Sequence, residues 1–177
     1  IETQIISRIG DDEIGKELLD FVTQNGVHTD SIQSDKNFAT GEVVVKLDDK
    51  GSASYTINYP VAWDKIEATP EAHKIVASAD ALVFGSLVCR DTTSYQSLLT
   101  LLNSAKYKIF DVNLRAPFYT KELLSELMNK ADFIKFNDDE LYEISAYLGS
   151  PFHSLEQNIQ FIAEKTKTSH ICVTKGS

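Results

Sequence analysis

The sequence is poor in cysteine and lacks long apolar runs. Among its 177 residues only Cys89 and Cys172 are cysteines, and they lie far apart within apolar stretches. That usage indicates buried thiols in a reducing compartment rather than a disulfide framework. No apolar run approaches the length of a membrane span. We therefore expect a cytoplasmic location and no membrane partner.

Basic residues are outnumbered by acidic ones. The chain has 17 lysines and arginines against 26 aspartates and glutamates, which gives a net charge of −9. This balance argues against a nucleic-acid backbone as the main partner, because such binding needs a basic surface. A phosphorylated small molecule stays possible, since it requires only local donors. The four histidines are scattered and show no zinc-ligand spacing with the cysteines.

Two glycine-rich nucleotide motifs are also missing. The G-x-x-x-x-G-K-[ST] spacing of a P-loop is absent, and Gly10 and Gly15 do not have the G-x-G-x-x-G spacing of a dinucleotide site. The missing dinucleotide motif counts against the hypothesis of a doubly wound oxidoreductase. Nicotinamide-cofactor binding without ATP binding would revive it.

What the sequence does contain is an alternation of short apolar strands and amphipathic helices. This order predicts an α/β fold with a mainly parallel sheet and helices on both faces. Strands are expected at 3–9, 81–88, 107–112, 132–136 and 170–174, and helices at 10–27, from 69 onward, and at 92–105, 120–131, 138–149 and 154–167.

The first predicted helix has a clear start, stripe and end. Asp11 or Asp12 can cap it, and Asn25-Gly26 can stop it. Its expected apolar stripe consists of Ile14, Leu18, Phe21 and Val22.

A different pattern interrupts this alternation. The segments 40–47 and 52–59 read as two strands around the turn "DDKG" at 48–51, and apolar and polar residues alternate along the second. A half-exposed antiparallel hairpin fits this pattern. We place it outside the main sheet. Trp63, just after the hairpin, is expected to be a packing residue rather than a ligand contact.

Polar residues follow several of the predicted strands. Ligands of parallel sheets bind beyond the carboxyl ends of the strands, so these positions are the candidate site. They are Gly85-Ser86, the "DVNLR" segment at 111–115, Asn137 to Glu140, and Thr174 to Gly176.

The spacing of Asn137 and Glu140 has two compatible explanations. A capping box accounts for it in full, with each residue bonding the backbone of the other. At a ligand crevice the same residues can also hold a phosphate through the Asn137 amide and a magnesium-bound water through Glu140.

The "DVNLR" and Thr174 segments are likewise open to two interpretations. Asp111, Asn113 and Arg115 point the same way if the strand continues, and Arg suits bidentate contact with an anion. An Asp111–Arg115 surface pair is the alternative. Backbone N–H groups at Thr174 to Gly176 can cradle a phosphate or simply form a turn.

The order of these pieces resembles the PfkB, or ribokinase-like, family of carbohydrate kinases. The successive segments are "SRIGDDEIGKELLDFVTQNGV", Thr40-Gly41 with its hairpin, "VFGSL", "FDVNLR", "DFIKFNDDEL" and "CVTKGS". "FDVNLRAPFY" and "KFNDDEL" are most similar to the fructokinase branch. The resemblance implies a ribokinase-like sheet with a small β lid formed in part by residues 40–60. Such a lid often makes a homodimer contact.

The resemblance also implies roles for individual residues. Sugar and the transferred phosphate would meet Gly85, Ser86, Asn113 and Arg115; ATP would meet Asn137, Thr174 and Gly176; and Glu140 would act near Mg²⁺.

Two parts of the family pattern are not in the sequence. The glycine-rich sugar-binding segment would precede Ile1, and the G-A-G-D motif with the aspartate base would follow Ser177; no G-x-G-D occurs between them. We therefore expect 1–177 to be a partial domain without a catalytic residue of its own, inactive alone. The parent chain would convert fructose to fructose 6-phosphate with ATP. The alternative is a non-catalytic ribokinase-like protein that binds a sugar or nucleotide.

Overall fold

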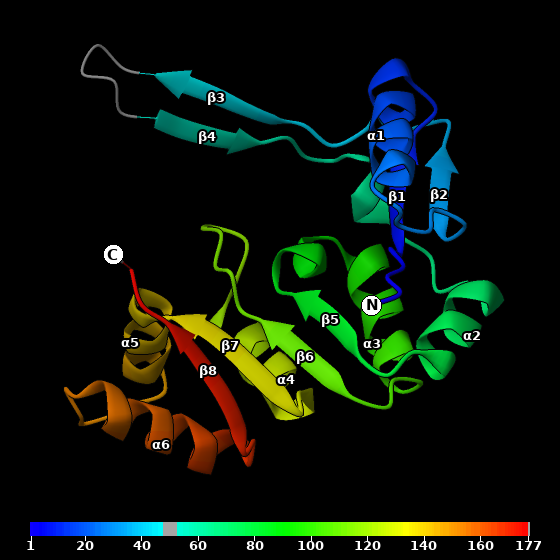
Figure 1. Ribbon diagram of the computed structural model, residues 1–177. Helices are drawn as coiled ribbons and strands as arrows, with labels where there is room; N and C mark the ends of the chain where they lie inside the picture. Colours follow the sequence, from blue (N-terminus) through cyan, green and yellow to red (C-terminus); the bar gives the residue numbers. More distant parts are fainter. Residues whose placement is uncertain (48–52, 177) are drawn as a thin grey trace.

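The computed structural model describes residues 1–47 and 53–176 (Figure 1). Its strands form a parallel pair, an antiparallel hairpin and a four-stranded parallel sheet ordered β5-β6-β7-β8. The strands are β1 (Ser7–Gly10), β2 (Ile32–Asp35), β3 (Val43–Leu47), β4 (Ala53–Ile57), β5 (Leu82–Gly85), β6 (Lys108–Asp111), β7 (Phe133–Asn137) and β8 (His170–Thr174).

The helices confirm the predicted alternation. They are α1 (Glu13–Gln24), α2 (Pro70–Ser78), α3 (Thr92–Leu102), α4 (Lys121–Lys130), α5 (Asp138–Tyr147) and α6 (Leu155–Thr166), with 3₁₀ turns η1 (Ala62–Lys65) and η2 (Leu87–Arg90). The α/β class with a mainly parallel sheet is thus confirmed. Among the described helices, none is long and apolar enough to cross a membrane.

One face of the four-stranded sheet carries the core. Phe84, Phe110, Ile134 and Phe136 lie on that face, because the first three are paired across the strands and the last is two residues further along β7. All four are buried together with side chains of α3, α4, α5 and α6. In Figure 1 the helices α3 and α4 lie behind the sheet. Burial of these apolar side chains is the main stabilising contribution here.

The opposite face of the sheet is less covered. Val83 lies on it and is 63% exposed, and its cross-strand neighbour Ile109 is only half-buried. Within the described residues, α3–α6 all pack into the core on the Phe84 face. The predicted helix cover is therefore seen on one face of this part of the chain.

The first strand and helix depart from the prediction in two ways. The strand is shorter than 3–9 and pairs with β2, which the sequence did not predict, rather than with the main sheet. Asp12 caps α1 as expected. The predicted apolar stripe of α1, however, is not packed. The side chains of Ile14, Leu18 and Phe21 are 44%, 42% and 65% exposed.

A compact polar contact joins the start of α1 to the base of the hairpin. Asp12 accepts hydrogen bonds from the Thr40 amide at 2.8 Å, the Thr40 hydroxyl at 2.6 Å and the Gly15 amide at 2.8 Å. The Thr40 hydroxyl oxygen in turn accepts from the Gly10 amide at 2.9 Å. These donors, the Thr40 hydroxyl foremost, lower the pKa of Asp12 from its ordinary value. The contact fixes where the chain enters the hairpin.

Gly10 is required by this close approach. A Cβ on Gly10 would lie 2.3 Å from the Asp12 carboxylate and 2.6 Å from the Thr40 amide nitrogen. We expect Gly10→Ala to lower the free energy of unfolding by about 1–3 kcal/mol, measured by urea denaturation. Gly176→Ala is the control, because a Cβ there meets nothing within 4 Å. Equal midpoints for the two variants would contradict the close contact.

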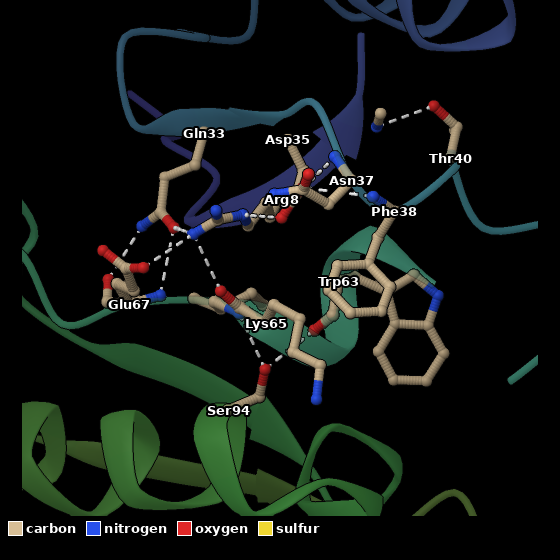
Figure 2. Close-up of polar contacts among 12 residues, drawn as sticks. Arg8, Gln33, Asp35, Asn37, Phe38, Thr40, Trp63, Lys65, Glu67 and Ser94 are labelled. Atoms are coloured by element: carbon tan, nitrogen blue, oxygen red, sulfur yellow. Dashed lines mark hydrogen bonds and ion pairs between the residues drawn. The ribbon is translucent and has the colours of Figure 1, made fainter. Parts of the chain in front are cut away.

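A second polar network ties β1 and β2 to the segment that follows the hairpin (Figure 2). Arg8 Nε donates to Asp35 at 2.7 Å, and Arg8 Nη1 donates to the Lys65 carbonyl at 3.0 Å. The Ser94 hydroxyl of α3 donates to the Trp63 carbonyl at 2.9 Å. The β1–β2 pair is thereby connected through η1 to α3 and the main sheet.

The hairpin itself is confirmed where it is described, and its turn at 48–51 lies outside the described residues. In Figure 1 it projects from the rest of the chain, on the side towards which the arrows of β5–β8 point. At its base, the Arg90 guanidinium lies 3.9 Å from the centre of the Trp63 ring and donates to Asp64 at 2.7 Å and to the Asn58 carbonyl at 2.6 Å. Trp63 is thus a packing residue, as predicted.

Candidate functional site

The loops after β5, β6, β7 and β8 emerge at one edge of the sheet. Gly85 pairs with Asp111, and Asn137 pairs with Thr174, so these strand ends are adjacent in register. The four arrows point the same way in Figure 1. Every residue predicted for the site lies at or just beyond these ends, and its assignment to a site remains a prediction.

Asn137 and Glu140 form the predicted capping box. The Asn137 side chain accepts from the Glu140 amide at 2.8 Å, and Glu140 Oε2 accepts from the Asn137 amide at 2.8 Å. This reciprocal bonding satisfies donors that a helix start would leave free. The cap explains why β7 ends and α5 begins at this point.

Glu140 also has a partner that the sequence did not reveal. Its second oxygen, Oε1, accepts from the Leu114 amide at 2.9 Å, in the loop after β6. Glu140 is only 6% exposed. Because Leu114 lies 26 residues earlier, no local spacing pattern could have predicted this contact.

Ser86 is turned inward rather than towards the strand-end edge. It is 1% exposed, and its hydroxyl donates to the Val112 carbonyl at 3.1 Å. This side chain therefore links the loop after β5 to the loop after β6. Gly85, beside it, leaves space: a Cβ there would come no closer than 3.4 Å, to the Asp111 carbonyl.

Asn113 and Arg115 are exposed polar residues of the loop after β6. Asn113 has a φ of 40°, in the left-handed region that asparagine tolerates better than most side chains. Arg115 Nη1 donates to the Leu114 carbonyl at 2.8 Å. The alternative Asp111–Arg115 pair is not what forms, because Asp111 pairs with Lys135 at 3.2 Å. Arg115 thus presents an exposed cation at the strand ends.

The end of β8 is also open to solvent. Thr174 and Gly176 are exposed, and the Thr174 hydroxyl donates to the Phe136 carbonyl at 3.3 Å. Among the described residues, nothing lies within 4 Å of a Cβ placed on Gly176. Such a segment leaves room for a phosphate group to approach its amides.

The described residues do not fit a direct magnesium site. No group of three or more His, Cys, Asp or Glu side chains in the described ranges could hold a metal ion. Both oxygens of Glu140 already accept backbone N–H groups. Mg²⁺ usually keeps several bound waters and needs few protein ligands, so contact through a bound water is compatible with these side chains.

A cavity of about 480 Å³ opens beside the loop after β6, lined in part by Cys89, Tyr95 and Phe118. Burial raises the pKa of the Cys89 thiol to about 12. The hydrogen bond from Tyr95 to Glu126 raises the pKa of Tyr95 to about 12. Both shifts favour the protonated form of these side chains. Both cysteines are free thiols, and they are half-buried rather than fully buried.

Curated relatives of the chain are sugar kinases by their descriptions. The chain is 27% identical over 151 residues to a putative sugar kinase of Pyrococcus horikoshii, covering 80% of this chain and 48% of that protein. It is 25% identical over 185 residues to the fructokinase of Vibrio alginolyticus, covering 99% of this chain and 58% of that protein. The chain spans about half the length of the curated relatives it matches.

Solved structures and family comparison agree on the fold. The fructokinase of Xylella fastidiosa superposes with a TM-score of 0.85 at 19% identity, covering 99% of this chain and 56% of that one. The ATP complex of the Pyrococcus horikoshii sugar kinase superposes with a TM-score of 0.74 at 25% identity, covering 82% and 51%. These likenesses confirm the predicted ribokinase-like fold. The family model described as "pfkB family carbohydrate kinase" matches residues 1–177. The chain therefore belongs to the PfkB family of carbohydrate kinases.

Proposed function

We propose that the protein containing this chain transfers the terminal phosphate of ATP to a small sugar, converting fructose to fructose 6-phosphate. The observation that carries this proposal is the exposed Arg115, which lies in the same strand-end edge as the accessible backbone of Thr174 to Gly176. Phosphoryl transfer depends mainly on positioning and on stabilising charge, and an exposed guanidinium suits both. The fructokinase relatives support fructose as the acceptor.

Within this proposal, the residues divide between the two substrates. Asn113 and Arg115, with the Gly85 backbone, face the sugar and the transferred phosphate, whereas Ser86 supports their loop through its inward hydrogen bond to Val112. The Asn137 cap, Thr174 and Gly176 face the nucleotide, where backbone N–H groups and the α5 dipole favour phosphate.

The magnesium ion and the catalytic base are not supplied by the side chains named above. Any contact of Glu140 with a magnesium ion carried by ATP is proposed to run through a bound water, since each of its oxygens already accepts one backbone N–H. The base is proposed to be an aspartate beyond Ser177, so that residues 1–177 alone are inactive. A sugar hydroxyl needs such a group to accept its proton.

The hairpin is proposed to act as a lid and as the contact of a homodimer in a cytoplasmic enzyme. Val43, Val45 and Tyr55 support this role, because they are 55%, 53% and 68% exposed on a projecting ribbon. Exposed apolar patches of this kind mark interaction surfaces. Sedimentation equilibrium of the full-length protein tests it. A monomer at all concentrations would contradict the dimer.

The enzymatic proposal is tested with the full-length protein and a panel of acceptors. ADP formation is followed with fructose, ribose, a nucleoside and 2-keto-3-deoxygluconate, and the fructose product is identified by NMR. Turnover on fructose, with phosphate on the 6-hydroxyl, is the expected result. Turnover on another acceptor alone overturns fructose while keeping the kinase. Binding of sugar or ATP without turnover identifies a non-catalytic binding protein instead.

A further inference from the structure

The loop that carries Arg115 begins with a constrained residue. Asn113 has a φ of 40°, whereas its predecessor Val112 is completely buried. A non-glycine residue in the left-handed region persists when the surrounding structure fixes it. Arg115 is two residues further on, so the conformation at Asn113 sets the direction in which the guanidinium leaves the sheet.

Two buried side chains hold this loop from opposite sides of Asn113. The Ser86 hydroxyl donates to the Val112 carbonyl at 3.1 Å, and Glu140 accepts from the Leu114 amide at 2.9 Å. Ser86 is 1% exposed and Glu140 is 6% exposed. The peptide groups before and after Asn113 are thus both bonded to the interior of the protein, while Asn113 itself remains exposed.

Helix α5 contacts the same loop at a second point. Glu143 Oε1 accepts from the Tyr119 hydroxyl at 2.7 Å, four residues beyond Arg115. Glu140 and Glu143 are three residues apart and therefore lie on the same face of α5. The helix consequently bonds to the loop on both sides of Arg115.

A glutamate at position 140 makes two bonds that a glutamine there could not make together. Its two oxygens accept from two different backbone amides, Leu114 and Asn137. Glutamine has one acceptor oxygen, so its NH₂ group would face one of these N–H donors without bonding it. A buried donor left unpaired is costly, and hydrogen bonds to a charged acceptor are the stronger ones.

We propose that Glu140, together with Ser86, is a positioning residue that holds Asn113 in its left-handed conformation and thereby directs Arg115 over the strand-end edge. This inference rests on the proposed function in one respect only, namely that Arg115 contacts a phosphate group. It differs from the metal role predicted for Glu140, because the carboxylate acts on the loop after β6 and not on magnesium.

The test compares Glu140→Gln with Asp139→Asn in the full-length protein. Asp139 is exposed in the same helical turn, so its variant removes the same charge without touching Leu114. We expect Glu140→Gln to speed hydrogen exchange of the Leu114 amide by about 10- to 100-fold, measured by NMR. We expect Asp139→Asn to leave that rate unchanged.

Kinetics supply the second readout. We expect Glu140→Gln to lower kcat by about 100-fold, because displacing a catalytic group by about 1 Å has this effect. The KM for ATP and the dependence on magnesium concentration should stay as in the unaltered protein. A metal role would instead shift the magnesium dependence.

The outcomes separate this inference from the proposed kinase activity. Faster Leu114 exchange with reduced kcat and unchanged magnesium dependence supports the inference. Faster exchange in a protein that has no kinase activity even when unaltered supports the positioning of the loop and overturns the proposed function. Unchanged Leu114 exchange in Glu140→Gln overturns the inference whatever the activity. If Glu140→Gln does not fold, Ser86→Ala replaces it and must raise the same exchange rate.

Discussion

Replacing Arg90 by alanine is expected to lower the free energy of unfolding by about 3–5 kcal/mol. The Arg90 and Asp64 side chains are 1% and 0% exposed and bond at 2.7 Å. Alanine at position 90 would leave the Asp64 carboxylate buried without its countercharge, which is the costly way to break such a pair. Folded domains have a total stability of about 5–15 kcal/mol, so the loss would be a large fraction of it.

The same change would loosen the base of the hairpin. Arg90 stacks on Trp63 and holds the Asn58 carbonyl, so three attachments are lost together. Chemical denaturation followed by circular dichroism measures the effect. Lys74→Ala is the control, because Lys74 forms an exposed pair with Glu71 at 3.8 Å, a contact that contributes little to stability. A loss below about 1 kcal/mol for Arg90→Ala would contradict the ion pair's role.

Replacing Arg115 by alanine is expected to lower kcat about 10²- to 10³-fold, the typical effect of removing one group that stabilises transition-state charge. Stability should hardly change, because Arg115 is exposed and its recorded hydrogen bond is to the adjacent Leu114 carbonyl. The two arginine variants are therefore expected to change different quantities. Replacing Arg90 lowers the free energy of unfolding, whereas replacing Arg115 lowers turnover.

A steady-state assay with saturating ATP and fructose measures this effect in the full-length protein. Arg115→Lys should recover only part of the rate, because an ammonium group keeps the charge but lacks the planar fork. Lys121→Ala, an exposed charge loss nearby in the sequence, is the control. Unchanged turnover in Arg115→Ala would remove Arg115 from the proposed site.

Local patterns predicted most of the secondary structure, because the relevant interactions are close in sequence. Asn137 caps α5 as predicted, and α2 starts where a helix was expected from 69 onward, with Thr69 as its cap and Pro70 at its first position. The alternation in 52–59 likewise predicted β4. In these segments the residues that begin and end an element stand within a few positions of one another.

Features that depend on distant residues were missed or only partly predicted. Strand β2 is short and polar, "IQSD", and its Asp35 bonds to Arg8 of β1, a residue 27 positions earlier. The stripe of α1 was predicted from periodicity, yet periodicity cannot say which surface is available to cover it. Leu18 and Phe21 remain 42% and 65% exposed.

The candidate site shows the same division. The sequence predicted which residues lie at the strand ends, because the carboxyl ends of parallel strands lie along one edge of the sheet. It did not reveal that Ser86 bonds inward to Val112, nor that Glu140 bonds to Leu114. Both contacts bridge 26 residues of sequence, and only the register of β5, β6 and β7 brings the partners together.

The two-stranded ribbon has a consequence for how the protein behaves in concentrated solution. Val43, Val44 and Val45 are 55%, 40% and 53% exposed, and successive residues of a strand point to opposite faces, so neither face is covered. The outer edges of such a ribbon also offer unpaired backbone groups to any extended chain. Aggregation is therefore expected to start by edge-to-edge pairing at β3, while the core around Phe110 is still intact.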